Sequence, residues 1–129
     1  MKILFVEDNA DVQEVVNRLL TLLGHEVIIA NDGVEGKLAF DQYADSIDLV
    51  ITDYRMPNAN GVEVLSHVKT KYPDMPVIIM TGFSDEFIHD PKIMLAPDWC
   101  LNKPVPFDIL KQVLAMAQLK IKPTNSGEV

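Results

Sequence analysis

The chain alternates short apolar runs with longer segments in which apolar residues recur at helical spacing. The apolar runs span residues 3–6, 27–30, 49–51 and 77–80, and a weaker run spans residues 99–101. Short, uninterrupted runs of this kind are typical of strands that are buried on both faces of a parallel sheet. We therefore predict four buried strands and a fifth, weaker one.

Between these runs, apolar residues repeat every three or four positions, which predicts amphipathic helices. The expected buried faces carry Val12, Val15, Val16, Leu19 and Leu23 in the first helix, Val34 and Leu38 in the second, Val62, Leu65 and Val68 in the third, and Phe107, Leu110, Leu114 and Ala117 in the last. Gly24 is suited to ending the first helix, and the third is expected to end before Tyr72 and Pro73.

A further helix is expected between the fourth and fifth strands, but prolines interrupt its sequence. Pro91 and Pro97 fall within residues 84–98, and a proline inside a helix costs about 3 kcal/mol. We therefore predict that this fourth helix is short, covering about residues 85–89, or displaced.

Strands that alternate with helices at this spacing pair in parallel through right-handed crossovers. The pattern predicts an α/β fold of the flavodoxin-like type, with an open five-stranded parallel sheet and helices on both faces. A chain of 129 residues can bury one substantial core and is too short to divide comfortably into two. We predict one domain over residues 1–121, followed by a polar tail or truncated linker at 122–129.

Composition and charge narrow the possible partners. The formal net charge of -8 opposes a phosphate backbone, so direct nucleic-acid binding is not expected, and proteins or a cation are the better candidates. No apolar run is long enough to cross a membrane, and acidic Glu7 and Asp8 follow the first run where a signal peptide would need small residues. We expect a cytoplasmic protein.

The single cysteine, Cys100, is expected to be a small buried apolar residue.

Polar residues follow the predicted strands at the point where each one ends. Glu7 and Asp8 come after the first strand, Asp53 after the third, Thr81 after the fourth and Lys103 after the fifth. The carboxyl ends of parallel strands share one edge of a sheet, which is where open sheets bind ligands. Taken singly, these residues could be helix caps or solvated charges; their shared location favours one functional pocket.

Three carboxylates in one pocket repel one another, because two unit charges 4 Å apart interact by about 4 kcal/mol at an effective dielectric constant of 20. Lys103 supplies one positive charge, and a divalent cation would supply two more. Hard carboxylate ligands without histidine or thiol favour Mg²⁺. Such a pocket suits phosphoryl transfer, with Asp53 as the nucleophile and with Thr81 and Lys103 contacting phosphoryl oxygens.

The same residues resemble the receiver family of two-component response regulators, the chemotaxis-regulator-like domains, over residues 2–120. The matching motifs are Phe5-Val6-Glu7-Asp8-Asn9, the run Asp53-Tyr54-Arg55-Met56-Pro57 with Gly61 after it, Met80-Thr81-Gly82, and Lys103-Pro104. Together they are highly specific.

This resemblance implies the strand order 2-1-3-4-5, which would place Asp8 beside Asp53. It further implies that a sensor histidine kinase or a phosphotransfer protein phosphorylates Asp53 and that the domain signals by a conformational change. Mg²⁺ would be bound by Asp8, Asp53 and the backbone carbonyl of Arg55, with Glu7 helping through water. Such a domain is not an enzyme in the usual sense, since it catalyses only its own phosphorylation and dephosphorylation.

The chain departs from the family pattern near its fifth strand. Receivers usually carry tyrosine or phenylalanine three positions before the lysine, whereas this chain has Cys100 there. Trp99 should point to the opposite face of the sheet, because side chains alternate along a strand, so it cannot replace the missing aromatic. The resemblance also implies a cis peptide bond between Lys103 and Pro104.

Two other functions remain open at this point. The first is an aspartate-nucleophile phosphatase of the haloacid-dehalogenase type, but those enzymes usually carry a second aspartate where this chain has Arg55. The second is a pseudo-receiver that serves only as a protein-interaction scaffold, a reading motivated by Cys100 and Pro91.

Overall fold

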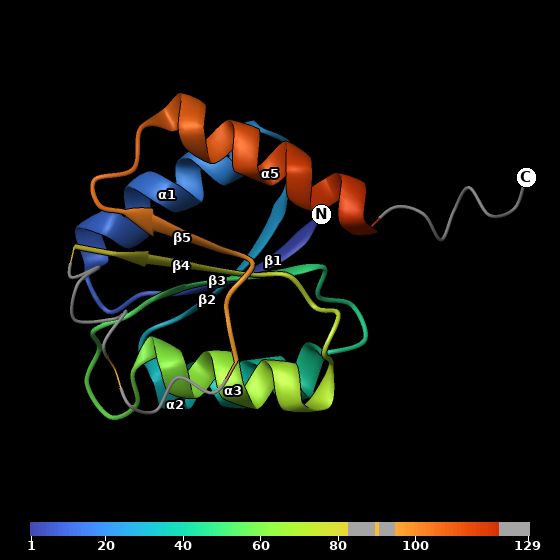
Figure 1. The fold of residues 1–129 in the computed structure, drawn as a ribbon. Helices are drawn as coiled ribbons and strands as arrows, with labels where there is room; N and C mark the ends of the chain where they lie inside the picture. Colours follow the sequence, from blue (N-terminus) through green and yellow to red (C-terminus); the bar gives the residue numbers. More distant parts are fainter. Residues whose placement is uncertain (83–89, 91–94, 122–129) are drawn as a thin grey trace, which may run out of the picture.

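The computed structural model describes residues 1–82, 90 and 95–121. The elements follow the order β1 (Lys2–Val6), α1 (Ala10–Leu22), β2 (Glu26–Ala30), α2 (Gly33–Tyr43), β3 (Leu49–Asp53), α3 (Gly61–Lys71), β4 (Val77–Thr81), β5 (Trp99–Asn102) and α5 (Phe107–Ile121). The five strands form one parallel sheet in the order β2-β1-β3-β4-β5. The predicted fold class and strand order are confirmed. Figure 1 shows α1 and α5 over one face of the sheet and α2 and α3 over the other.

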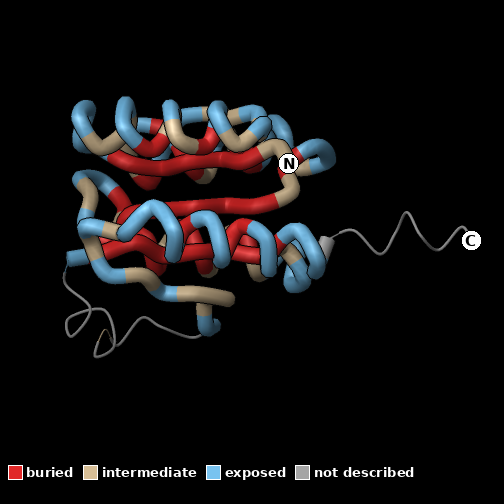
Figure 2. Tube along the Cα trace, turned by 90° about the horizontal axis from the view of Figure 1, so that it is seen from above, coloured by how far each residue is buried: buried red, intermediate tan, exposed pale blue. Residues whose placement is uncertain are grey.

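Two apolar clusters, one on each face of the sheet, form the core. Leu4 and Val6 of β1 belong to the cluster under α2 and α3, whereas Ile3 and Phe5 belong to the cluster under α1 and α5. This division follows from the alternation of side chains along a strand. The central strands are buried between the exposed outer surfaces of the helices (Figure 2).

The edge strand β2 does not match the expectation of burial on both faces. Ala30 is buried, Val27 and Ile28 are partly buried, and Ile29 is 38% exposed. An apolar run at the edge of a sheet has a neighbouring strand on one side only, and the apolar pattern alone does not tell an edge strand from a central one.

The buried faces of α3 and α5 were predicted well, and that of α2 was not. Val62, Leu65 and Val68 of α3 are buried, as are Leu110, Leu114 and Ala117 of α5, whereas Phe107 is 44% exposed. In α2 the predicted residues Val34 and Leu38 are 42% and 64% exposed, and the helix instead buries Gly33, Gly36 and Phe40. A side chain at Gly36 would press on Val6, with its Cβ 2.9 Å from Val6 Cγ2, so α2 approaches β1 through glycine rather than through an apolar stripe.

The apolar face of α1 is rotated relative to the prediction. Val16 and Leu20 are buried against the sheet, whereas Val15 is 59% exposed. The helix starts at Asn9, whose side chain accepts hydrogen bonds from the backbone N–H groups of Asp11 and Val12. As predicted, it ends before Gly24, which adopts a φ of 92°.

Two predictions fall outside the described residues: the short fourth helix at about 85–89 and the polar tail at 122–129. The domain boundary at residue 121 therefore stays a prediction. In the part of the chain that the structure describes, no helix has the length and apolar character needed to span a membrane.

Candidate functional site

The predicted site residues gather at the carboxyl-terminal edge of the sheet. Glu7 follows β1 directly, and Lys103 follows β5. Asp53 and Thr81 are the last residues of β3 and β4 rather than the first residues beyond them. Because β1, β3 and β4 are neighbours in register, residues from separate parts of the chain meet at one place.

Glu7, Asp8 and Asp53 form the acidic cluster that the sequence predicts. Each offers a carboxylate oxygen, and these oxygens lie within 4.8 Å of one another. Glu7 is only 1% exposed and Asp53 8%, whereas Asp8 lies at the open surface. Closely spaced, partly desolvated carboxylates need positive charge between them.

Lys103 provides part of that charge. Its Nζ atom lies 2.8 Å from Glu7 Oε1 and 3.1 Å from Asp53 Oδ2, so one ammonium group bridges both buried carboxylates. Burial raises the pKa of Glu7, and the hydrogen bond from Lys103 counters this only in part. Burial opposes the charged form of Lys103, but the hydrogen bond to Glu7 and the charge of Asp53 outweigh it and raise the lysine's pKa.

The carboxylate of Asp53 is fixed from two sides. Its Oδ1 atom accepts a hydrogen bond of 2.8 Å from the backbone N–H of Tyr54, and Oδ2 faces Lys103. The main chain is held too, because Thr52 Oγ1 donates to the carbonyl of Asp53 at 2.9 Å and the N–H of Gly61 donates to the carbonyl of Tyr54 at 2.7 Å. A Cβ atom at position 61 would collide with the carbonyl oxygen of Asp53, which explains the glycine there.

Glu7 is positioned by contacts that the sequence pattern did not reveal. The backbone N–H of Asn9 donates to Glu7 Oε2 at 3.1 Å, and the N–H of Glu7 donates to the carbonyl of Ala30 at 3.0 Å. Gln13 Nε2 donates to the carbonyl of Glu7 and also to Asn31 Oδ1. A glutamine on an amphipathic helix carries no sequence signal for such a role, so Gln13 could not have been found beforehand.

The predicted roles of Thr81 and Arg55 stay predictions. Thr81 is fully buried, and its carbonyl accepts a 3.0 Å hydrogen bond from the N–H of Lys103, which ties the ends of β4 and β5 together. Arg55 is exposed and lies two residues beyond Asp53. The peptide bond between Lys103 and Pro104 is cis, as the family resemblance implied.

The prediction that Cys100 is buried is wrong. The cysteine is exposed, since β5 lies at the edge of the sheet and alternates between half-buried and exposed residues. Trp99 packs on the α1 and α5 side, whereas Cys100 pairs in register with Ile79, which belongs to the cluster on the other face. The two residues therefore point to opposite faces, as predicted.

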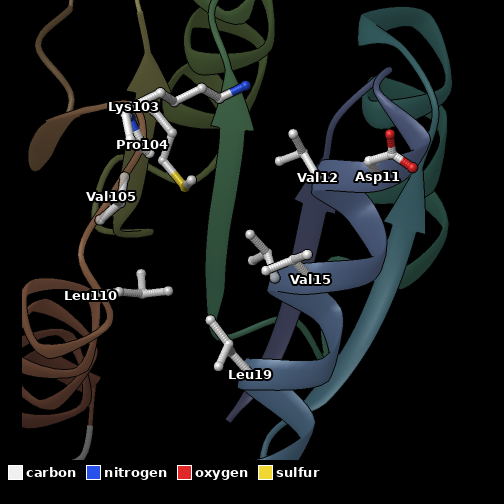
Figure 3. A pocket seen from close by; sticks show the side chains of 10 residues that line it. Asp11, Val12, Val15, Leu19, Lys103, Pro104, Val105 and Leu110 are labelled. Carbon is white, nitrogen blue, oxygen red and sulfur yellow. The ribbon is translucent and has the colours of Figure 1, made fainter.

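An apolar groove of about 490 Å³ opens beside this site, between α1 and the start of α5. Figure 3 shows Val12, Val15 and Leu19 of α1 facing Val105 and Leu110 across it, with Lys103 at one end. The sequence pattern did not predict the groove, because it assigned Val15 to the core.

Comparison with known proteins identifies the family. The sequence model described as "Response regulator receiver domain" matches residues 3–115. The chain belongs to this family. As a receiver domain of two-component systems it has the phosphoacceptor role that the sequence analysis expected.

Curated relatives support the same assignment. The receiver domain is 30% identical over 126 residues to the "Transcriptional regulatory protein CpxR homolog" of Haemophilus influenzae, covering 97% of this chain and 54% of that protein. It is 38% identical over 84 residues to the "Chemotaxis protein CheY homolog" of Campylobacter jejuni, covering 63% and 64%. The chain thus spans about half the length of the first of these relatives.

Solved structures agree in fold. A response regulator receiver domain protein from Clostridium thermocellum superposes with a TM-score of 0.81 at 35% identity, covering 90% of this chain and 92% of that one. The response regulator TrrA from Thermotoga maritima, solved in complex with Mg(2+)-BeF, gives a TM-score of 0.78 at 29% identity and covers 90% and 97%. The three clustered carboxylates of the present receiver domain are hard oxygen ligands of the type that Mg²⁺ prefers.

Proposed function

We propose that this receiver domain accepts a phosphoryl group on Asp53 from a sensor histidine kinase or a phosphotransfer protein, in a Mg²⁺-dependent reaction, and signals by changing conformation. One observation carries the proposal. The Asp53 carboxylate is held between a backbone N–H and the Lys103 ammonium group, inside a cluster of three converging carboxylates. Asp8, Asp53 and the backbone carbonyl of Arg55 would hold the metal, with Glu7 acting through water.

The chemistry is an in-line displacement at phosphorus. A carboxylate oxygen of Asp53 bonds to phosphorus while the bond from phosphorus to the donor's imidazole nitrogen breaks, and that electron pair leaves with the imidazole. Mg²⁺, when bound, neutralises charge on the phosphoryl oxygens. Lys103, already 3.1 Å from Asp53, would pair with one phosphoryl oxygen, and the hydroxyl of Thr81 would donate to another.

The groove between α1 and α5 is where we expect the donor protein to dock. A phosphohistidine must reach Asp53, and the groove ends at Lys103, which contacts Asp53 directly. Its apolar walls, including the 59% exposed Val15, can bury an apolar helix face of the donor.

We also predict that the domain does not bind nucleic acid directly, because its net charge of -8 opposes a phosphate backbone. The expected cytoplasmic location stays a prediction as well.

Phosphoryl acceptance is tested by intact-mass measurement after incubation with acetyl phosphate and Mg²⁺. The wild type should gain the mass of one phosphoryl group. Asp53→Asn should gain none, and the matched control Asp74→Asn, at an exposed position outside the cluster, should behave as the wild type does. A wild type without any Asp53-dependent gain would favour the pseudo-receiver scaffold.

The phosphatase alternative has its own test, because turnover of a small phosphate ester would reveal it. The family match and Arg55, in place of a second aspartate, support a signalling phosphoacceptor instead. We expect no turnover of p-nitrophenyl phosphate beyond the uncatalysed rate.

A further inference from the structure

Tyr54 connects two parts of the molecule that lie far apart in sequence. Its backbone N–H donates to Asp53 Oδ1 at 2.8 Å, and its phenol hydroxyl donates to Asp90 Oδ2 at 2.7 Å. Asp90 lies 36 residues further along the chain, between β4 and β5. The tyrosine is only 4% exposed and packs in the core cluster under α2 and α3. One residue therefore contacts the phosphoacceptor with its main chain and a distant carboxylate with its side chain.

We propose that Tyr54 relays the phosphorylation state of Asp53 to Asp90. This inference rests on the proposed phosphorylation of Asp53, and it assigns to a named pair of hydrogen bonds the way in which the change is sensed elsewhere in the domain. Tyr54 is a positioning residue here, since only its main chain contacts the reacting side chain.

Phosphorylation changes the hydrogen bond at one end of this connection. The Asp53 carboxylate carries one negative charge, which its two oxygens share. In the acyl phosphate one oxygen is bonded to phosphorus and the other is a neutral carbonyl, so the negative charge moves to the phosphoryl oxygens. Whichever oxygen reacts, Oδ1 becomes a weaker acceptor for the N–H of Tyr54, because hydrogen bonds to ionised groups are about twice as strong as neutral ones.

The surroundings of Tyr54 direct that change toward Asp90. The carbonyl of Tyr54 is anchored by a 2.7 Å hydrogen bond from the N–H of Gly61. When the hydrogen bond to Asp53 weakens, the N–H and the side chain of Tyr54 are therefore the parts that gain freedom to move. The ring is buried and closely packed, and packed side chains move as units rather than deform. A displacement of the Tyr54 peptide therefore alters the contact between its hydroxyl and Asp90.

Tyr54 also supplies an aromatic ring on the face of the sheet where the chain has Cys100 instead of the usual aromatic residue. Cys100 pairs in register with Ile79, and Ile79 and Tyr54 belong to the same core cluster. The hydrogen bonds of Tyr54 thus link the end of β3 to the face of the sheet on which Cys100 lies. Coupling of this kind works in both directions by thermodynamic linkage, so the contact with Asp90 should in turn affect the phosphorylation equilibrium of Asp53.

The test uses the backbone amide resonance of Asp90 in the ¹⁵N-labelled full chain, recorded with Mg²⁺ before and after acetyl phosphate is added. In the wild type, phosphorylation should shift this resonance. In Tyr54→Phe, which removes only the hydroxyl, the phosphorylation-dependent shift should be lost. Intact mass gives the phosphorylated fraction of each sample, so spectra are compared at equal fractions.

Tyr72→Phe is the matched control. Its hydroxyl lies 3.5 Å from Asp45 on an exposed surface after α3, and its removal should leave the shift at Asp90 intact. A phosphorylated wild type with no shift at Asp90, or a phosphorylated Tyr54→Phe that keeps the full shift, would overturn the relay. A wild type that accepts no phosphoryl group would instead overturn the proposed function on which the relay rests.

Discussion

Lys103 is the residue whose charge makes the acidic pocket tolerable. It bridges Glu7 at 2.8 Å and Asp53 at 3.1 Å, and Glu7 is almost fully buried. A buried carboxylate that loses its partner keeps its desolvation penalty without compensation. The stability of the domain should therefore depend on Lys103 through Glu7 in particular.

Replacement of the lysine by a neutral side chain of similar length tests this dependence. We expect Lys103→Met to lower the free energy of unfolding by about 1–3 kcal/mol at neutral pH, because Glu7 loses its cationic partner and the hydrogen bond to Oε1. Glu7→Gln in the same background should recover part of the loss, since a neutral amide needs no cation. Lys37→Met, on the surface of α2, serves as the control in urea denaturation. Equal losses of stability in Lys103→Met and Lys37→Met would argue against the ion pair between Lys103 and Glu7.

Some site residues could be predicted from the sequence, and others could not. Motif residues such as Glu7, Asp53 and Lys103 were found because parallel strands must end at a common edge. Cys100 was misplaced because its apolar neighbours suggested a core strand, whereas β5 lies at the edge of the sheet. Gln13 contacts a backbone carbonyl and the side chain of Asn31, and neither contact leaves a pattern in the sequence.

Among the secondary-structure elements, Asp98 joins the amino-terminal ends of β4 and β5 to two helices. Its carboxylate accepts hydrogen bonds from Lys69 of α3 at 2.7 Å, from Lys120 of α5 at 2.8 Å and from the N–H of Val77 at 2.8 Å. Burial acts to raise the pKa of Asp98, but the two lysines and the N–H of Val77 outweigh it, so the pKa is lowered.

A lowered pKa fixes the pH range in which this carboxylate stabilises the fold. Its contribution is full above the ordinary aspartate pKa of about 3.9 and is lost as the pH falls through the lower folded-state value. Asp98→Asn should therefore reduce the free energy of unfolding by about 1–3 kcal/mol at pH 7, and the difference from the wild type should shrink below about pH 4. Asp74→Asn, at an exposed aspartate, is the control; a difference that did not vary with pH would contradict the assignment.

The groove between α1 and α5 gives a second prediction for these elements. Val15→Asp places a charge on its apolar wall without disturbing the core, because Val15 is 59% exposed. Phosphoryl transfer from a cognate histidine kinase should slow by about tenfold or more, equal to about 1.4 kcal/mol. Transfer from acetyl phosphate, which needs no docking, should be unchanged. Leu38→Asp, at an exposed position of α2, is the matched control. If Val15→Asp slowed transfer from acetyl phosphate as much as transfer from the kinase, the groove would not be the docking site.

Helical faces show why the elements were predicted less completely than the site. Periodicity placed the buried faces of α3 and most of α5 correctly, since their apolar residues form one stripe. The helix α2 instead approaches Val6 of β1 through Gly36 and the loop residue Ala59 through Gly33, and close backbone approach leaves no apolar signal. Val15 extends an apolar stripe that the core only partly covers.

For the whole molecule, the parallel topology converts sequence separation into proximity. Glu7 and Lys103 are 96 residues apart, yet they are in direct contact because β1 and β5 end at the same edge. The same topology sets Asp8 next to Asp53, so the pocket concentrates negative charge in a chain whose net charge is already -8. The folded domain, and not the unfolded chain, should therefore bind a divalent cation.

Calorimetric titration of Mg²⁺ into the purified domain measures directly whether the acidic cluster binds the ion. The wild type should bind a single ion, and Asp8→Asn should weaken its affinity by about tenfold or more, equal to about 1.4 kcal/mol. Asp11→Asn, at a nearby exposed carboxylate outside the cluster, should bind Mg²⁺ as the wild type does. Absence of binding at millimolar Mg²⁺, or equal affinities of the wild type and Asp8→Asn, would show that Glu7, Asp8 and Asp53 do not form a cation site.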